Sequence, residues 1–308
     1  MPSAGPPDLA VEIGALRLQN PILAASGTFG YGVEFAHLLD LNKLGGFVTK
    51  GLSREPMEGA PAPRLTPTPS GMLNAVGLQN VGVRAFVAEK LPKLAGLKCA
   101  VVANVFGYAV EDYVEVIRVL EDAPTLAAYE LNISCPNTKR GGVQYGVDPA
   151  LTSEVVAAAR RAASRRPLWV KLSPQVTDIA LIARAAVEAG ADALTVANTY
   201  PAMSIDPATR RSRIGNLTGG LSGPAIRPIT LRLVHEVSKA VRVPIIGLGG
   251  IETPSDIIEY VLAGSTAVQV GTASFADPRA CETLVSGLSE WCSRNKISNI
   301  NKLRGALE

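Results

Sequence analysis

Cysteine and histidine are scarce in this chain, which argues against most classes of metal protein. Four cysteines and two histidines are spread over 308 residues, and no two cysteines form a Cys-x-x-Cys pair. Structural zinc sites and iron–sulfur clusters need closely spaced thiolate and imidazole ligands. We therefore expect no metal site formed by this chain alone.

Long apolar runs and a strong charge of one sign are also missing. No apolar stretch is long enough to span a membrane, and the first residues show no basic segment followed by an apolar one. The net charge of +3 gives no reason to expect nucleic acid or a membrane surface as a partner. We therefore expect a cytoplasmic protein. The 47% of hydrophobic residues predict a large core.

The sequence does contain eight short apolar runs separated by helix-like segments. Helical periodicity is clearest in Leu151–Arg166, Ile179–Ala189 and Ile226–Ala240. Such repeats predict an α/β fold, a (β/α)8 TIM barrel, with an open doubly wound sheet as the alternative. Val11–Gln19 predicts a hairpin that closes the barrel bottom, and the absence of a linker predicts one domain over residues 1–308. The runs are Pro21–Ser26, Phe47–Gly51, Cys99–Phe106, Ala128–Ser134, Leu168–Ser173, Ala193–Thr199, Pro244–Gly250 and Ala267–Ala273.

Polar residues and glycines stand at the carboxyl ends of all eight runs. In a parallel barrel these ends meet at one rim, and that rim carries function. Burying many amides together with two lysines, Lys50 and Lys171, is costly unless each group finds a partner. Any one of these groups could bond a neighbouring loop, but the whole ring is better explained by a large polar ligand.

The last two strand ends indicate an anionic part of that ligand. Gly249–Gly250 is followed by Thr253–Asp256, which predicts a helix capped by the threonine with proline at its first position. Gly271–Thr272 is followed by Asp277–Pro278, which predicts a second start of this kind. Backbone amides that glycines leave accessible near a helix start bind phosphate. The loops after the seventh and eighth strands are the usual phosphate site of barrel enzymes.

The segment Tyr129–Asn137 places a thiol just beyond a strand. Pro136 removes a backbone donor and ends the strand, so Cys135 lies at its mouth, three residues after Asn132. The following Gly141–Gly142 gives the loop freedom to move. An inert buried cysteine is the alternative, and for an isolated cysteine it would be preferred.

Two connections are longer than a barrel needs. Leu52–Gly82 follows the second run and is rich in proline and glycine, which suggests a lid or a binding loop. Tyr200–Gly223 follows the sixth run and carries Arg210, Arg211 and Arg213. That cluster could face a partner or an acidic substrate, but a solvated loop is favoured.

Four motifs together closely resemble the dihydroorotate dehydrogenase family. They are Asn74–Asn80, Asn132–Asn137, Val170–Pro174 and Gly219–Pro224, and the resemblance runs from Val11 to the C-terminal helix. It is strongest to the catalytic subunit of the NAD-linked class, class 1B. A cysteine stands where the membrane-associated class has serine, an N-terminal membrane-binding extension is missing, and the segment 216–226 is similar to this class rather than to the fumarate-using class.

The resemblance implies an FMN-binding barrel that oxidises (S)-dihydroorotate to orotate in pyrimidine (UMP) biosynthesis. Cys135 would be the base that removes the C5 proton, while the C6 hydride passes to the flavin. Lys171 would stabilise reduced FMN, and Lys50 would bridge flavin and substrate. Lys139–Gly142 would form a flap that closes over the substrate.

The resemblance also assigns the remaining site residues. The substrate set is Lys50, Asn74, Ala75, Val76, Gly77, Leu78, Asn132, Asn198 and Thr199. The FMN set is Ser26, Lys50, Gly51, Asn104, Asn132, Lys171, Ala197, Gly223, Gly249, Gly250, Gly271 and Thr272. Ala197 stands where the family often has a β-branched residue, and the contact implied there is through the backbone.

Electrons must then leave the flavin. The chain has no Gly-x-Gly-x-x-Gly motif after a strand for NAD and no cysteine cluster for iron–sulfur. The resemblance implies a partner subunit with FAD and a 2Fe–2S cluster, in a heterotetramer built on a dimer of this chain. The alternatives are a fumarate-dependent homodimer, a tRNA-modifying FMN barrel, which the mild net charge disfavours, and a non-catalytic barrel that binds a phosphorylated metabolite.

Overall fold

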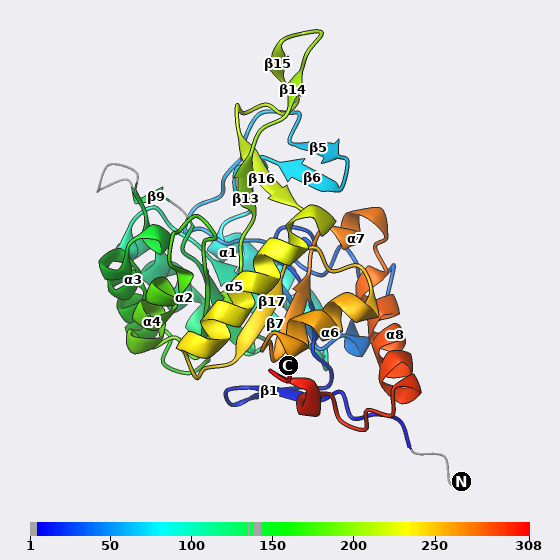
Figure 1. Ribbon diagram of the computed structural model, residues 1–308. Helices are drawn as coiled ribbons and strands as arrows, with labels where there is room; N and C mark the ends of the chain where they lie inside the picture. Colours follow the sequence, from blue (N-terminus) through cyan, green and yellow to red (C-terminus); the bar gives the residue numbers. More distant parts are fainter. Residues whose placement is uncertain (1–4, 135, 138–142) are drawn as a thin grey trace.

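A closed barrel of eight parallel strands forms the centre of the computed structural model, which describes residues 5–134, 136–137 and 143–308 (Figure 1). Each strand overlaps one predicted run, so the predicted (β/α)8 barrel is confirmed and the open sheet is wrong. Around the barrel the strands are β3 (Ile22–Ala24), β4 (Gly46–Val48), β7 (Ala100–Val105), β8 (Ala128–Asn132), β11 (Leu168–Lys171), β12 (Ala193–Val196), β17 (Ile245–Leu248) and β18 (Ala267–Val270).

Helices cover the outside of the barrel because each has one apolar face. In α4 (Ile179–Glu188) the buried residues Ile179, Ile182, Ala183 and Ala186 follow the helical repeat. The other helices are α1 (Val83–Ala85), α2 (Val110–Glu121), α3 (Pro149–Ala162), α5 (Arg227–Ala240), α6 (Pro254–Leu262), α7 (Ala273–Ala276) and α8 (Ala280–Arg294), with a π-helical turn at Phe86–Lys90. Within the described residues, none of these helices is long and apolar enough to cross a membrane.

An antiparallel hairpin closes the bottom of the barrel, as predicted. It consists of β1 (Val11–Ile13) and β2 (Leu16–Leu18) and lies at the end opposite the long connections (Figure 1). Ile13 and Leu18 are buried in the same apolar cluster as the barrel strands. The function-bearing rim is therefore the other end.

The two long connections pair with each other above that rim. They form one antiparallel sheet in the order β13 (Tyr200–Ala202), β16 (Gly219–Ser222), β6 (Gly71–Asn74) and β5 (Leu65–Thr68). Beyond it, the hairpin of β14 (Ile205–Asp206) and β15 (Arg211–Ser212) projects furthest from the barrel (Figure 1). Arg210, Arg211 and Arg213 are exposed on this hairpin, which agrees with a solvated loop. A further short pair joins β9 (Pro136–Asn137) to β10 (Val143–Gln144).

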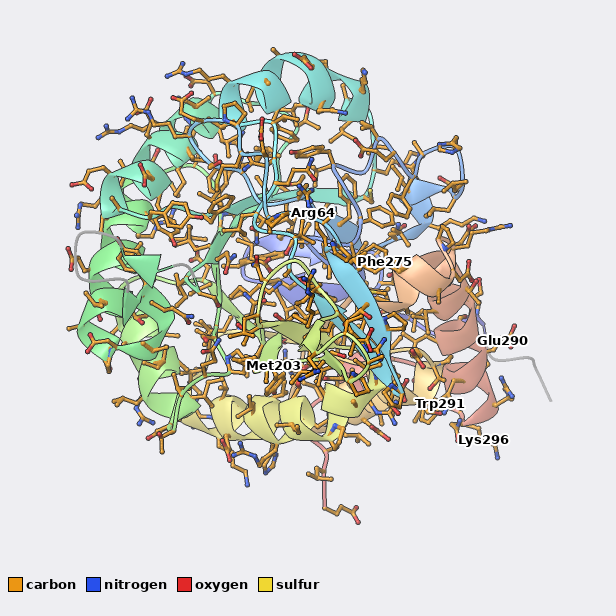
Figure 2. The ribbon with its side chains drawn as sticks, turned by 90° about the horizontal axis from the view of Figure 1, so that it is seen from above. Arg64, Met203, Phe275, Glu290, Trp291 and Lys296 are labelled. Carbon is orange, nitrogen blue, oxygen red and sulfur yellow. The ribbon has the colours of Figure 1, made fainter. Side chains whose placement is uncertain are left out.

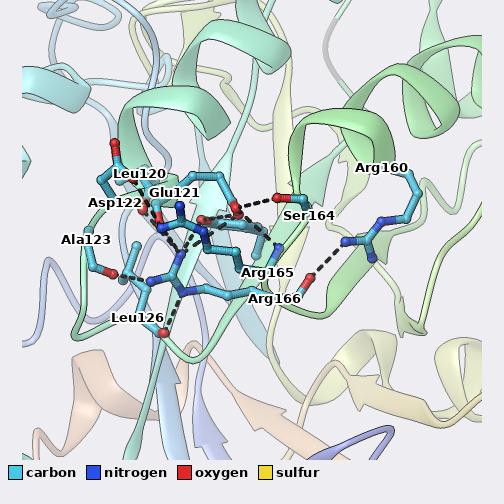
Figure 3. A network of polar contacts seen from close by, with 10 residues as sticks. Leu120, Glu121, Asp122, Ala123, Leu126, Arg160, Ser164, Arg165 and Arg166 are labelled. Atoms are coloured by element: carbon cyan, nitrogen blue, oxygen red, sulfur yellow. Dashed lines mark hydrogen bonds and ion pairs between the residues drawn. The ribbon is translucent and has the colours of Figure 1, made fainter.

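A half-buried arginine ties the end of α2 to the start of β11 (Figure 3). Arg166 donates hydrogen bonds to the carbonyl oxygens of Leu126 and Glu121, each at 2.8 Å, and to that of Ala123. It also donates to the Tyr129 hydroxyl at 3.0 Å. The guanidinium thus satisfies carbonyls that the last turn of a helix leaves unpaired.

Replacing Arg166 with methionine is expected to destabilise the protein by about 3 kcal/mol, because several buried acceptors lose a charged donor together. Arg165→Met is the matched control: the Arg165 side chain is 65% exposed, and its ion pair with Asp122 lies at 3.2 Å on the surface. That change should cost less than about 1 kcal/mol. Denaturant unfolding measures both, and equal losses would contradict a structural role specific to Arg166.

Candidate active site

A pocket of about 380 Å³ opens at the carboxyl ends of the barrel strands, in the range of small-molecule and cofactor sites. Residues of the four-stranded sheet line part of it, so the long connections contribute directly to the site. Every described residue of the two predicted sets lines this pocket. These are Ser26, Lys50, Gly51, Asn74, Ala75, Val76, Gly77, Leu78, Asn104, Asn132, Lys171, Ala197, Asn198, Thr199, Gly223, Gly249, Gly250, Gly271 and Thr272.

The structure does not describe the predicted base or the predicted flap. Cys135 and the segment 139–142 lie outside the described residues. Their described neighbours Asn132 and Ser134 line the pocket.

The prediction missed the apolar part of the wall. Leu65 and Met72 come from the sheet above the rim, and Phe275 comes from α7, where it is 45% exposed. Seen from above, Phe275 and Arg64 lie over the barrel, whereas Trp291 and Lys296 lie at its outer edge (Figure 2). No local pattern marks Leu65 and Met72, because they reach the pocket only through pairing between distant loops. The other missed residues are Ala25, Gly27, Thr28, Gln79, Ser134, Ser222, Ile226 and Leu248.

Two lysines bring positive charge to the pocket wall. Lys171, at the end of β11, is only 6% exposed, and its Nζ donates to Ser26 Oγ at 3.2 Å. Burial lowers the pKa of Lys171 from its usual value, and the nearby Glu130 opposes that shift. Burial also lowers the pKa of Lys50, helped by the Arg64 guanidinium. Both cations are therefore short of compensating negative charge, which an anionic ligand would supply.

Amide side chains form a connected cluster beside the lysines. Asn198 Nδ2 donates to Asn132 Oδ1 at 3.2 Å and to Ser134 Oγ at 3.0 Å. Asn198 Oδ1 in turn accepts from the backbone amide of Thr199 at 2.8 Å. Asn74 Nδ2 donates to the Gly220 carbonyl at 3.0 Å and so joins the two long connections. Such a cluster offers fixed donors and acceptors for a flat polar ring.

The glycine-rich end of the pocket is shaped for close approach of a ligand. Gly250 has φ +68°, and a Cβ added there would lie 2.7 Å from the Gly223 carbonyl oxygen, so only glycine fits. At Gly271 an added Cβ would meet no atom closer than 3.6 Å, so protein packing does not demand a glycine there. A side chain at Gly271 would instead take up pocket space.

One of the two predicted helix starts near this end is confirmed and the other is wrong. Thr253 Oγ1 accepts from the Asp256 amide at 3.3 Å, and Asp256 accepts from the Thr253 amide at 2.8 Å, a complete capping box for α6. Asp277 is not the N-cap: it ends the short α7, and α8 begins at Ala280, two residues after the predicted first position. The Asp277 side chain instead accepts from the Arg279 amide at 2.9 Å in the turn between the two helices.

The three described cysteines are unsuited to acid–base chemistry. Cys99, Cys281 and Cys292 are buried and free. Burial raises the pKa of Cys99 to about 11 and that of Cys281 to about 12, and it also raises the pKa of Cys292. These thiols would remain protonated near neutral pH.

The barrel and the polar pocket at its rim are typical of (β/α)8-barrel enzymes. Within that class, the family model described as dihydroorotate dehydrogenase matches residues 8–291. The chain therefore belongs to the dihydroorotate dehydrogenase family, a family of oxidoreductases.

Relatives align over nearly their whole length. A protein of Solibacter usitatus with the provisional name dihydroorotate dehydrogenase A (fumarate) is 59% identical over 302 residues, which cover 98% of this chain and 99% of the relative. Proteins of Trichlorobacter lovleyi and Pelobacter propionicus are 53% and 52% identical with the same coverage. Both are named dihydroorotate dehydrogenase B (NAD(+)), catalytic subunit. The family is thus shared, while the names differ in the electron acceptor.

Proposed function

We propose that this chain uses FMN, held in the rim pocket, to oxidise (S)-dihydroorotate to orotate in pyrimidine biosynthesis. The observation that carries the proposal is the pocket itself, where the buried Lys171, the half-buried Lys50 and an amide cluster converge in a chain of this family. Dihydroorotate and orotate are anionic rings with amide-like edges, which suit both kinds of group. FMN, when bound, supplies the hydride acceptor.

The residues present fit a flavin mononucleotide. Gly249, Gly250, Gly271 and Thr272 would hold the phosphate end, where Gly271 leaves room that the protein does not fill. Lys171, fixed by Ser26, would place a positive charge against the polar edge of the ring. The further flavin contacts would be Gly51, Asn104, Asn132, Ala197 and Gly223, with Lys50 between flavin and substrate.

The substrate would lie against the amide cluster and the loop 74–78. Asn132, Asn198, Thr199 and Asn74 would orient its ring. Cys135 would take the C5 proton. A free thiol titrates at about 8.5, near enough to neutral pH for proton transfer. Burial raises the pKa of all three other cysteines, which supports this choice.

For the electron acceptor, we propose NAD reached through a partner subunit that carries FAD and a 2Fe–2S cluster. Several relatives at about 50% identity are named catalytic subunits, a name that implies a further subunit. Fumarate is the second candidate, because the relative at 59% identity is named for it.

An acceptor assay separates the two candidates. The purified chain is loaded with FMN, given dihydroorotate, and supplied with fumarate or NAD, with and without the partner subunit of a class 1B relative. Turnover with NAD only in the presence of that subunit supports the proposal. Turnover of the chain alone with fumarate would contradict it and favour the homodimeric class.

Gly271→Leu is expected to abolish FMN retention while the protein stays folded, because the new side chain occupies pocket space rather than packed interior. Gly271→Ala, with its smaller volume, should weaken retention less. Flavin absorbance after gel filtration measures retention, and denaturant unfolding of the flavin-free proteins checks the fold. Full FMN occupancy in the leucine variant would place the phosphate elsewhere.

A further inference from the structure

A carboxylate lies buried in the barrel just below the rim pocket, and neither predicted residue set contains it. Glu130 is on β8, two residues before Asn132, and its side chain is fully buried. Its two oxygens accept hydrogen bonds from three other strands: from Asn104 Nδ2 at 2.8 Å, from Thr195 Oγ1 at 2.7 Å and from Gln269 Nε2 at 2.5 Å. An ionised carboxylate accepts only, so this set of donors suits the charged form.

Asn104 connects this carboxylate to the pocket. It donates to Glu130 from one side of its amide and lines the pocket from β7. Because the Glu130 oxygen fixes the Asn104 nitrogen, it also fixes which way the amide plane lies at the pocket wall. Glu130 therefore orients a pocket group without touching the ligand.

The charge of Lys171 is a second link between Glu130 and the pocket. In the register of β8 and β11, Lys171 pairs with Asn132, two residues from Glu130, so the side chains of Lys171 and Glu130 lie on the same face of the paired strands. Lys171 donates to the neutral Ser26, and the negative charge of Glu130 opposes the lowering of the Lys171 pKa by burial. A lysine that is 6% exposed would otherwise lose its proton easily, because burial disfavours the charged form. At the pocket's other cation, Lys50, it is Glu34 that opposes the lowering of the pKa.

We propose that Glu130 is a positioning residue for the rim pocket: it is the counter-charge of Lys171, and it holds the Asn104 amide in place. The proposal rests on the proposed function, since the charge of Lys171 matters to catalysis only if a flavin lies against it. A purely structural role predicts instead that Glu130 stabilises the barrel and nothing more.

The test uses Glu130→Gln, which keeps the shape and removes the charge. In the FMN-loaded protein, Lys171 then loses its proton, so the preference of the site for reduced over oxidised flavin should fall about tenfold. For a two-electron couple that corresponds to a midpoint potential about 30 mV lower. In a Lys171→Met background the same substitution removes only a negative charge, so the potential should rise instead.

A purely structural role would not make Glu130→Gln shift the midpoint potential in opposite directions in the two backgrounds. Thr195→Val is the matched control, since it deletes one hydrogen bond to Glu130 but keeps the charge. It should cost stability and leave the potential unchanged. If Glu130→Gln alone does not fold, the double variant and Lys171→Met still give the comparison; equal potentials for those two would overturn the proposal.

A second arm needs no flavin. The pKa of the Lys171 side chain is about 10.5 in the unfolded chain and lower in the folded protein. At a pH between these two pKa values, the unfolded state binds one proton more than the folded state. Stability therefore rises with pH across that window. In Glu130→Gln the folded pKa falls further, so the rise should begin at lower pH; with Lys171→Met this contribution disappears.

The potential measurements and the unfolding curves distinguish failure of the proposed function from failure of the proposed role of Glu130. If wild-type protein neither retains FMN nor reacts with dihydroorotate, the proposed function fails, yet the unfolding curves still test the coupling of Glu130 to Lys171. If Glu130→Gln and wild type show the same dependence of stability on pH, the coupling is absent, whatever the flavin does.

Discussion

Replacing Cys135 with alanine should leave FMN bound and slow its reduction by dihydroorotate by a factor of about 10²–10⁴, because a positioned base is lost. Cys135 follows the pocket residues Asn132 and Ser134 in the chain, so its substitution leaves the described pocket wall intact. Stopped-flow loss of the flavin absorbance under anaerobic conditions measures the rate. In the wild type that rate should rise with pH until the thiol is ionised.

Cys99→Ala is the control for this substitution. Cys99 is buried and free, and burial raises the pKa of its thiol to about 11. Its substitution should change stability but not the reduction rate at saturating dihydroorotate. Equal reduction rates for Cys135→Ala and wild type would remove Cys135 from the role of base.

Replacing Lys171 with methionine should lower the preference of the site for reduced over oxidised flavin by about 10- to 100-fold. The reason is that a hydrogen bond from a charged group is worth about 1.5–3 kcal/mol. The midpoint potential of bound FMN should accordingly fall by about 30–60 mV for a two-electron couple. A spectroscopic titration with a reference dye measures it, and an unchanged potential would contradict the proposed contact.

Lys50→Met provides the comparison, since Lys50 lines the same pocket but is assigned to lie between flavin and substrate. Its main effect should be weaker binding of orotate, with a smaller change in the potential of the substrate-free protein. If the two lysine variants gave the same pattern, the assignment of separate roles would be wrong.

The barrel was predictable because its signals are local. Each strand is a short run of apolar residues, and the capping box at Thr253 and Asp256 can be recognised within four residues. The rim residues follow from the same logic, since all carboxyl strand ends meet at one face of a parallel barrel. Their identity as one site came from the family resemblance and the polar character of the ring.

What could not be predicted depends on contacts between distant segments. The pairing of Gly220 with Asn74 joins two connections that each look like an irregular loop, and it brings Leu65 and Met72 to the pocket. The second helix start was misplaced because Asp277 and Pro278 form the turn between α7 and α8 rather than the first residues of α8. Glu130 gave no signal either, because a single acidic residue in an apolar strand reveals its partners only when the barrel closes.

The most direct test of the account is an anaerobic titration of the purified, FMN-loaded chain with (S)-dihydroorotate. We expect the yellow flavin band to bleach with stoichiometric formation of orotate, without any other protein present. A protein that binds FMN and stays yellow in excess dihydroorotate would leave the barrel and its family standing and contradict the proposed substrate.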